Sequence, residues 1–92
     1  MGRSLEEKRI LLGLNITYYR RAQNLTQGQL AERARISSNY LSQIERGFKN
    51  VSLVTLTQIT EVLGIEEVDL FDFSRGTPSL EQNDNDLPHA KR

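Results

Sequence analysis

The residues of this chain that could take part in chemistry gather in one segment, from Thr26 to Gly47. A helix in the second half of this segment would turn a set of hydrogen-bonding side chains outward: Ser37, Ser38, Asn39, Ser42, Gln43 and Arg46. Hydroxyls, amides and a guanidinium can bond to base edges and to phosphates, and almost no acidic charge accompanies them. This is the chemistry that a helix in the major groove of DNA requires.

Other kinds of chemistry find no support in the sequence. There is no cysteine, and the single histidine, His89, lies near the C-terminal end. A catalytic triad needs three groups held within hydrogen-bond reach, and we expect residues 74–92 around this histidine to be disordered. Asp84 to Asp86 lack the glycine and distal glutamate of a calcium loop, and no glycine-rich phosphate loop is present. We therefore expect no enzymatic activity, no metal site and no cofactor.

Two short helices must position the polar segment. Thr26 is a suitable N-cap for a helix over residues 27–34, and Ser37 can cap a second helix that ends at Gly47. A tight turn separates them. Apolar side chains would join the pair to the rest of the domain: Leu30, Ala31, Ile36, Leu41 and Ile44.

A further helix is predicted on the N-terminal side. Ser4 to Glu7 has the form of a capping box, and Asn24 is a plausible left-handed end residue. Gly13 leaves open a break, so residues 1–11 are either an extension or the early part of this helix. An apolar stripe marks its buried side: Leu12, Ile16 and Tyr19.

On the C-terminal side, Ser52 caps a fourth helix that ends at Gly64, and residues 65–73 are predicted to form a short fifth helix. The body of the domain then spans residues 12–73. Residues 74–92 are rich in Ser, Asn, Asp, Gln, Gly and Pro, and we expect a disordered polar tail there.

Length and charge fit a small DNA-binding domain. The 92 residues allow one domain, and their net charge is zero. The charge is divided unevenly, because nine basic and four acidic residues give residues 1–50 a net +5 and residues 51–92 carry −5. The longest apolar run, Ile10 to Leu12, is too short to span a membrane, and no signal peptide is visible, so we expect a cytoplasmic protein.

The spacing of these residues resembles the xenobiotic-response-element (XRE) family of lambda-repressor-like helix-turn-helix regulators. The resemblance covers roughly residues 12–72 and includes Leu25 to Gln27 and the run from Tyr40 to Gly47. It implies an all-α, five-helix bundle. Residues 27–34 would form the positioning helix and residues 37–45 the recognition helix.

The resemblance also implies which side chains contact DNA. Gln27, at the start of the positioning helix, would contact a phosphate, and the loop after the recognition helix would meet the opposite backbone. Arg35 replaces the glycine usual in the turn, which adds a positive charge and costs about 1 kcal/mol in a left-handed conformation. The expected contacting residues are Gln27, Arg35, Ser37, Ser38, Asn39, Tyr40, Gln43, Arg46, Lys49 and Asn50.

Each of these roles has a purely structural alternative. Ser37 could serve as a helix cap, and Tyr40 could pack on the core. Arg20 is expected to pair with Glu45 and to orient the recognition helix, whereas an exposed pair would contribute little. Several polar residues could be ordinary solvated surface: Gln27, Asn39, Gln43, Arg46 and Lys49.

Regulators of this kind bind two-fold symmetric sites as dimers, with half-sites about one helical turn apart. The C-terminal part of the body has more apolar residues than a core of this size absorbs. A homodimer interface is therefore expected over Val54, Val62, Val68, Phe71 and Phe73. The alternative is that most of these residues complete the core of the monomer.

The leading hypothesis is a transcriptional regulator that binds pseudo-palindromic operators in double-stranded DNA as a homodimer. Its size suits a phage-type repressor or a restriction–modification controller. A second hypothesis is a protein-interaction module, such as an antitoxin, whose residues 74–92 bind a partner protein.

We predict a steep salt dependence of DNA binding. If about three to five phosphates are neutralised per protomer, log affinity should fall with log salt at a slope of about −3 to −4.5. Fluorescence anisotropy titrations of a labelled duplex over a salt series measure this slope. An affinity that stays flat from low to moderate salt would contradict an interface built on phosphate contacts.

Overall fold

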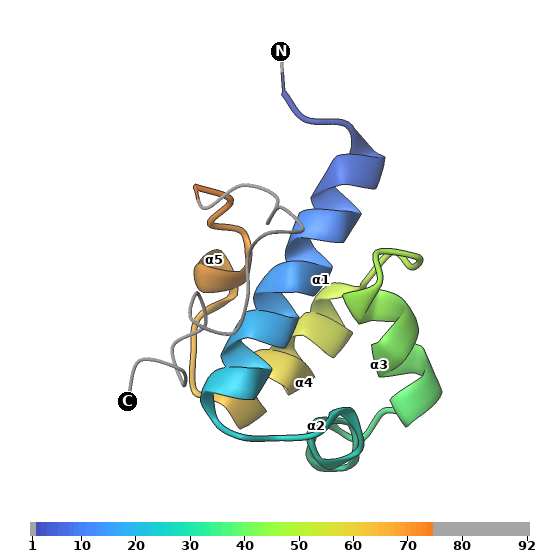
Figure 1. Ribbon diagram of the computed structural model, residues 1–92, viewed down its shortest axis with the longest axis vertical. Helices are drawn as coiled ribbons and strands as arrows, with labels where there is room; N and C mark the ends of the chain where they lie inside the picture. Colours follow the sequence, from blue (N-terminus) through green and yellow to red (C-terminus); the bar gives the residue numbers. More distant parts are fainter. Residues whose placement is uncertain (1, 75–92) are drawn as a thin grey trace.

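The computed structural model describes residues 2–74, and in this range the chain forms five helices and no strand (Figure 1). The all-α, five-helix prediction is confirmed. The expected tail and its possible protein partner lie outside the described residues, apart from Ser74. The helices are α1 (Leu5–Ala22), α2 (Gln27–Ala34), α3 (Ser38–Glu45), α4 (Leu53–Leu63) and α5 (Glu67–Leu70).

Local side chains set the helix boundaries. The first four helices each follow a hydroxyl group that accepts a hydrogen bond of 3.0–3.1 Å from the backbone N–H three residues on: Ser4, Thr26, Ser37 and Ser52. Left-handed residues follow the first four helices: Asn24 after α1 at φ 59°, Arg35 after α2 at φ 64°, Gly47 after α3 at φ 82°, and Gly64 after α4 at φ 70°. The chain therefore turns sharply at these points.

All five helices contribute to one core. α1 lies between α3 on one side and α5 on the other, while α2 and α4 contact each other across the end of the bundle (Figure 1). Burial of each large apolar side chain stabilises the fold by about 1.5–3 kcal/mol. The fully buried ones come from every helix in turn: Ile16, Leu30, Leu41, Ile44, Ile59 and Leu70.

Gly13 does not break α1, which continues from Leu5 to Ala22. A Cβ built on Gly13 would lie 2.5 Å from the carbonyl oxygens of Ile44 and Glu45. The glycine therefore lets the backbone of α1 approach the end of α3 more closely than any side chain would allow. Its cost in helix propensity is offset by this close packing.

α5 is shorter than the predicted helix over residues 65–73. It is a single turn from Glu67 to Leu70. Asn15, buried on α1, donates from its Nδ2 to the carbonyl oxygens of Leu70 at 2.7 Å and Asp72 at 3.1 Å. These long-range bonds take up carbonyl groups that a longer helix would use itself, so α5 ends there.

Within residues 2–74, none of the helices combines the length and the apolar character needed to cross a membrane.

The role of Gly13 predicts opposite effects for two glycine substitutions. Gly13→Ala should lower the free energy of unfolding by about 1–3 kcal/mol, because its methyl group meets backbone atoms that cannot move aside. Gly28→Ala on α2 is the matched control, since the nearest atom to its Cβ would be 3.9 Å away. It should raise stability by about 0.5–1 kcal/mol. Urea denaturation measures both; equal stabilities for the two variants would refute the close-packing role.

Candidate nucleic-acid interface

The outward side of α3 is polar and carries no exposed acid. Leu41 and Ile44 are buried on the core side. Ser38 and Asn39 are exposed in the first turn, and Gln43 is half-buried one turn further on. The one acidic residue of the helix, Glu45, is buried at its C-terminal end. The exposed side chains can therefore approach base edges without a neighbouring carboxylate that repels phosphates.

The turn before α3 contains two of the expected contact residues. Arg35 is exposed and takes the left-handed conformation at φ 64°, ψ 39°. Ser37 is the N-cap of α3, where its Oγ accepts from the N–H of Tyr40 at 3.0 Å, and its own hydroxyl hydrogen is still able to donate. Tyr40 is half-buried and packs against the core. The turn thus places a guanidinium and a hydroxyl at the N-terminal end of α3.

Arg20 and Glu45 form a buried ion pair between the end of α1 and the end of α3. Arg20 Nε donates to Glu45 Oε2 at 2.8 Å, and Nη2 donates to Oε1 at 3.0 Å. The two side chains are 10% and 4% exposed. The remaining Nη1 donates to the carbonyl oxygen of Leu25 at 2.8 Å, so the guanidinium also fixes the start of the loop to α2. Two parallel bonds give this pair a defined orientation.

Glu45 also orients two further side chains. Its Oε1 accepts from Thr17 Oγ1 at 2.9 Å and from Gln27 Nε2 at 2.8 Å. Gln27 is half-buried, and its amide is held by one of its two N–H groups. The other N–H group is not used by this bond and can donate to a phosphate. The expected phosphate contact of Gln27 is thus compatible with its place beside Glu45.

The segment after α3 carries exposed positive charge. The guanidinium of Arg46 lies 4.7 Å from the ring centre of Phe48, which is 61% exposed. Stacking on the ring restricts Arg46 at low entropic cost. Lys49 is exposed beside it. Both cations lie next to the C-terminal end of α3, where the expected contact with the second DNA strand would form.

Arg9 contacts this candidate site, although no pattern in the sequence indicates that it would. Its Nε donates to the carbonyl oxygen of Gly47 at 3.3 Å, and its Nη1 donates to Oδ1 of the exposed Asn50 at 3.1 Å. Arg9 lies 38 and 41 positions away from these partners. A basic residue on α1 was visible in the sequence, but its partners depend on how α1 crosses the loop.

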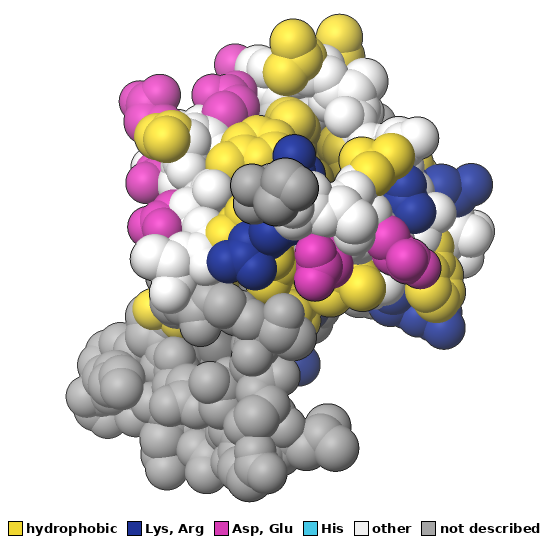
Figure 2. Space-filling model, turned by 90° about the horizontal axis from the view of Figure 1, so that it is seen from above, with side chains coloured by type: hydrophobic (Ala, Val, Ile, Leu, Met, Phe, Trp, Pro, Cys, Tyr) yellow, Lys and Arg dark blue, Asp and Glu magenta, His cyan; other side chains and the backbone are white. Residues whose placement is uncertain are grey.

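The charge of the described chain is distributed unevenly. Figure 2 shows most Asp and Glu side chains along the left edge, the side of α5, whereas Lys and Arg side chains lie in the middle of this face and on the right, the side of α3, with further acidic side chains between them. Residues 51–74 contain five acidic and no basic residues. Such an uneven distribution favours one orientation toward a polyanion.

The residues expected at a dimer interface differ in their exposure. Val54 and Val68 are 71% and 70% exposed, and Phe71 is 45% exposed. Phe73 is half-buried and meets Phe71 edge to face at 6.1 Å between ring centres. Val62 packs against the monomer core. The first three residues leave apolar area uncovered in the described part of the chain.

The fold and the site together define a helix-turn-helix domain of the DNA-binding type. The sequence model of the family described as helix-turn-helix matches residues 16–70. The chain therefore belongs to this family and is a DNA-binding transcriptional regulator, which confirms the resemblance found in its sequence. Its relatives are regulators and controller proteins, in agreement with the prediction that it is not an enzyme.

Three comparisons illustrate this membership. The HTH-type transcriptional regulator y4dJ of Sinorhizobium fredii is 36% identical over 72 residues, which are 78% of this chain and 94% of that protein. The restriction-modification controller protein C.AhdI from Aeromonas hydrophila is 34% identical with a TM-score of 0.66, over 67% of this chain and 94% of that chain. SinR from Bacillus subtilis, a master regulator for biofilm formation solved in complex with DNA, is 34% identical with a TM-score of 0.64, over 66% and 98% of the two chains.

We predict that substitutions of the buried Arg20–Glu45 pair can restore stability without restoring DNA affinity. Arg20→Met leaves the Glu45 carboxylate buried without its cation and should cost about 3–5 kcal/mol in urea denaturation. Adding Glu45→Leu removes the stranded charge and should restore most of that loss. DNA affinity of the double variant should stay low, because Gln27 has lost the acceptor that holds it. A double variant that binds a duplex like the unmodified protein would show that the pair serves stability alone.

Proposed function

We propose that this regulator binds a pseudo-palindromic operator as a homodimer, with residues 37–45 of each protomer in successive major grooves. The observation that carries the proposal is the polar outer side of α3, held in place by the buried Arg20–Glu45 pair. A recognition helix needs both properties, because base readout depends on donors and acceptors kept in fixed positions.

The proposed contacts fall into two kinds. We assign the reading of base edges to Asn39 and Gln43, since their amides can bond bidentately to adenine. Contacts to phosphates would position the domain without reading sequence. We assign these contacts to residues around α3 and its flanking turns: Gln27, Arg35, Ser37, Ser38, Tyr40, Arg46, Lys49 and Asn50.

The proposed dimer uses the apolar residues that α4 and α5 leave exposed. Thr57 and Thr60 donate from their hydroxyls to Glu67 Oε2 at 3.3 Å and 3.2 Å, which holds α5 against α4. Val54 lies one turn before Thr57, and Val68 follows Glu67, so both valines lie on neighbouring turns of two contacting helices. A symmetric contact there would cover apolar area and leave the basic side of each protomer toward DNA.

We infer that the protein is a small regulator that controls transcription from the promoters it occupies. The likeness to the controller protein C.AhdI and to the regulator y4dJ supports this assignment. A cytoplasmic location is part of the proposal, because the operator would be found there.

Selection of bound sites from random duplex DNA tests the proposal. The expected result is a two-fold symmetric consensus, with half-sites about one helical turn apart. Sedimentation of the complex should give two protomers per duplex, and Val54→Glu should reduce this to weak binding of one protomer. The proposal is wrong if the selected sites lack symmetry, or if a monomer at micromolar concentration binds a specific duplex with unit stoichiometry.

A further inference from the structure

We propose that Arg9 is a positioning residue of the DNA interface. It holds the loop after α3 and turns the amide of Asn50 so that its NH2 group faces outward as a phosphate donor. This inference rests on the proposed function, because it names the residue that prepares one of the expected backbone contacts.

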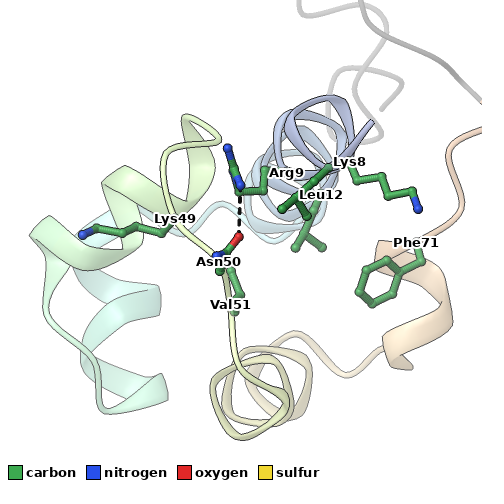
Figure 3. A pocket seen from close by; sticks show the side chains of 8 residues that line it. Lys8, Arg9, Leu12, Lys49, Asn50, Val51 and Phe71 are labelled. Carbon is green, nitrogen blue, oxygen red and sulfur yellow. Dashed lines mark hydrogen bonds between the residues drawn. The ribbon is translucent and has the colours of Figure 1, made fainter. Parts of the chain in front are cut away.

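Arg9 reaches the loop from α1 with two donors of its guanidinium. Nε donates to the Gly47 carbonyl oxygen at 3.3 Å, and Nη1 donates to Asn50 Oδ1 at 3.1 Å (Figure 3). The neighbouring residue packs on the same glycine, since a Cβ on Gly47 would lie 2.8 Å from Ile10 Cγ1. Successive residues of α1 therefore hold the loop where it leaves α3, at a left-handed glycine of φ 82°.

The guanidinium selects the orientation of the Asn50 amide. Arg carries donors and no acceptor, so the amide must turn its oxygen toward Arg9. Its Nδ2 then points away from Arg9 and keeps two N–H groups for another partner. Phosphate oxygens are acceptors only, and an amide with its oxygen outward would repel them. Arg9 thus prepares the donor side of Asn50 before DNA arrives.

The charge of Arg9 also suits this place. Within residues 2–74, the partners of the Arg9 guanidinium are a carbonyl oxygen and an amide oxygen, and no carboxylate pairs with it there. The last turn of α3 contains no basic residue of its own. Arg9 brings a cation to the negative end of the α3 dipole, whereas the Lys49 side chain extends away from it (Figure 3).

Lys8 offers a matched control on the same helix. Arg9 and Lys8 both line a hollow of about 350 Å³ whose other walls include Lys49 and Phe71. Figure 3 shows the Lys8 side chain extending toward Phe71, away from the loop that Arg9 contacts. Arg9→Ala and Lys8→Ala therefore each remove one positive charge from adjacent positions. Only Arg9→Ala also removes the two hydrogen bonds to the loop after α3.

The first measurement uses the full chain without DNA. Hydrogen exchange of the Gly47 and Phe48 amides should become about tenfold faster in Arg9→Ala, the effect of losing one charge-assisted bond. In Lys8→Ala the same amides should change by less than about twofold. Equal exchange in the two variants would overturn the positioning role, whatever the protein binds. Circular dichroism checks that both variants are folded.

The second measurement is affinity for the selected duplex. Arg9→Ala should weaken binding about tenfold or more, and Arg9→Lys should weaken it nearly as much, because an ammonium cannot form both bonds at once. Adding Asn50→Ala to Arg9→Ala should weaken binding by less than about a further twofold relative to Arg9→Ala alone. Binding by Arg9→Lys like that of the unmodified protein, or multiplying effects of the two substitutions, would overturn the proposal. If the unmodified chain selects no duplex, the proposed function fails, while the exchange result still decides whether Arg9 orders the loop.

Discussion

The buried ion pair of Arg20 and Glu45 is the interaction on which the rest of this interface depends. Two charges removed from water are tolerated when their remaining donors and acceptors are satisfied. Here Glu45 accepts from Arg20, Thr17 and Gln27, and Arg20 also donates to the Leu25 carbonyl oxygen. The pair therefore fixes the end of α1, the start of α2 and the end of α3 in one network. Such a network holds α3 in a single position relative to α2, the positioning helix.

Close backbone packing complements this network. Gly13 brings α1 against the carbonyl groups of Ile44 and Glu45, and Gly47 does the same beside Ile10. Hydrogen bonds fix the orientation of α3, whereas these two glycines fix its distance from α1. A helix that presents amides to base edges needs both constraints, because a displacement of about 1 Å is enough to break a bidentate bond.

Features fixed by neighbours in the sequence were predictable, and those fixed by distant partners were not. The caps Ser4, Thr26, Ser37 and Ser52 act within a few residues, so the starts of their helices were predicted correctly. The end of α5 depends on Asn15, which is 55 positions from Leu70. Gly13 is accommodated within α1 because the helix packs closely against the backbone at the end of α3. The role of Arg9 depends on its hydrogen bonds to the loop after α3, which is distant in the sequence. Long-range geometry of this kind leaves no local signal.

The burial of Glu45 also explains how a chain of zero net charge can present a basic surface. An acid at the end of a recognition helix would repel phosphates if it were exposed. Placed inside and neutralised by Arg20, it organises the interface without contributing negative charge to it. Of the eight other acids in residues 2–74, five follow residue 51, while Arg35, Arg46 and Lys49 flank α3 in the sequence. Because potentials near the surface depend on nearby charges more than on the total, this placement favours DNA approach by the side of α3.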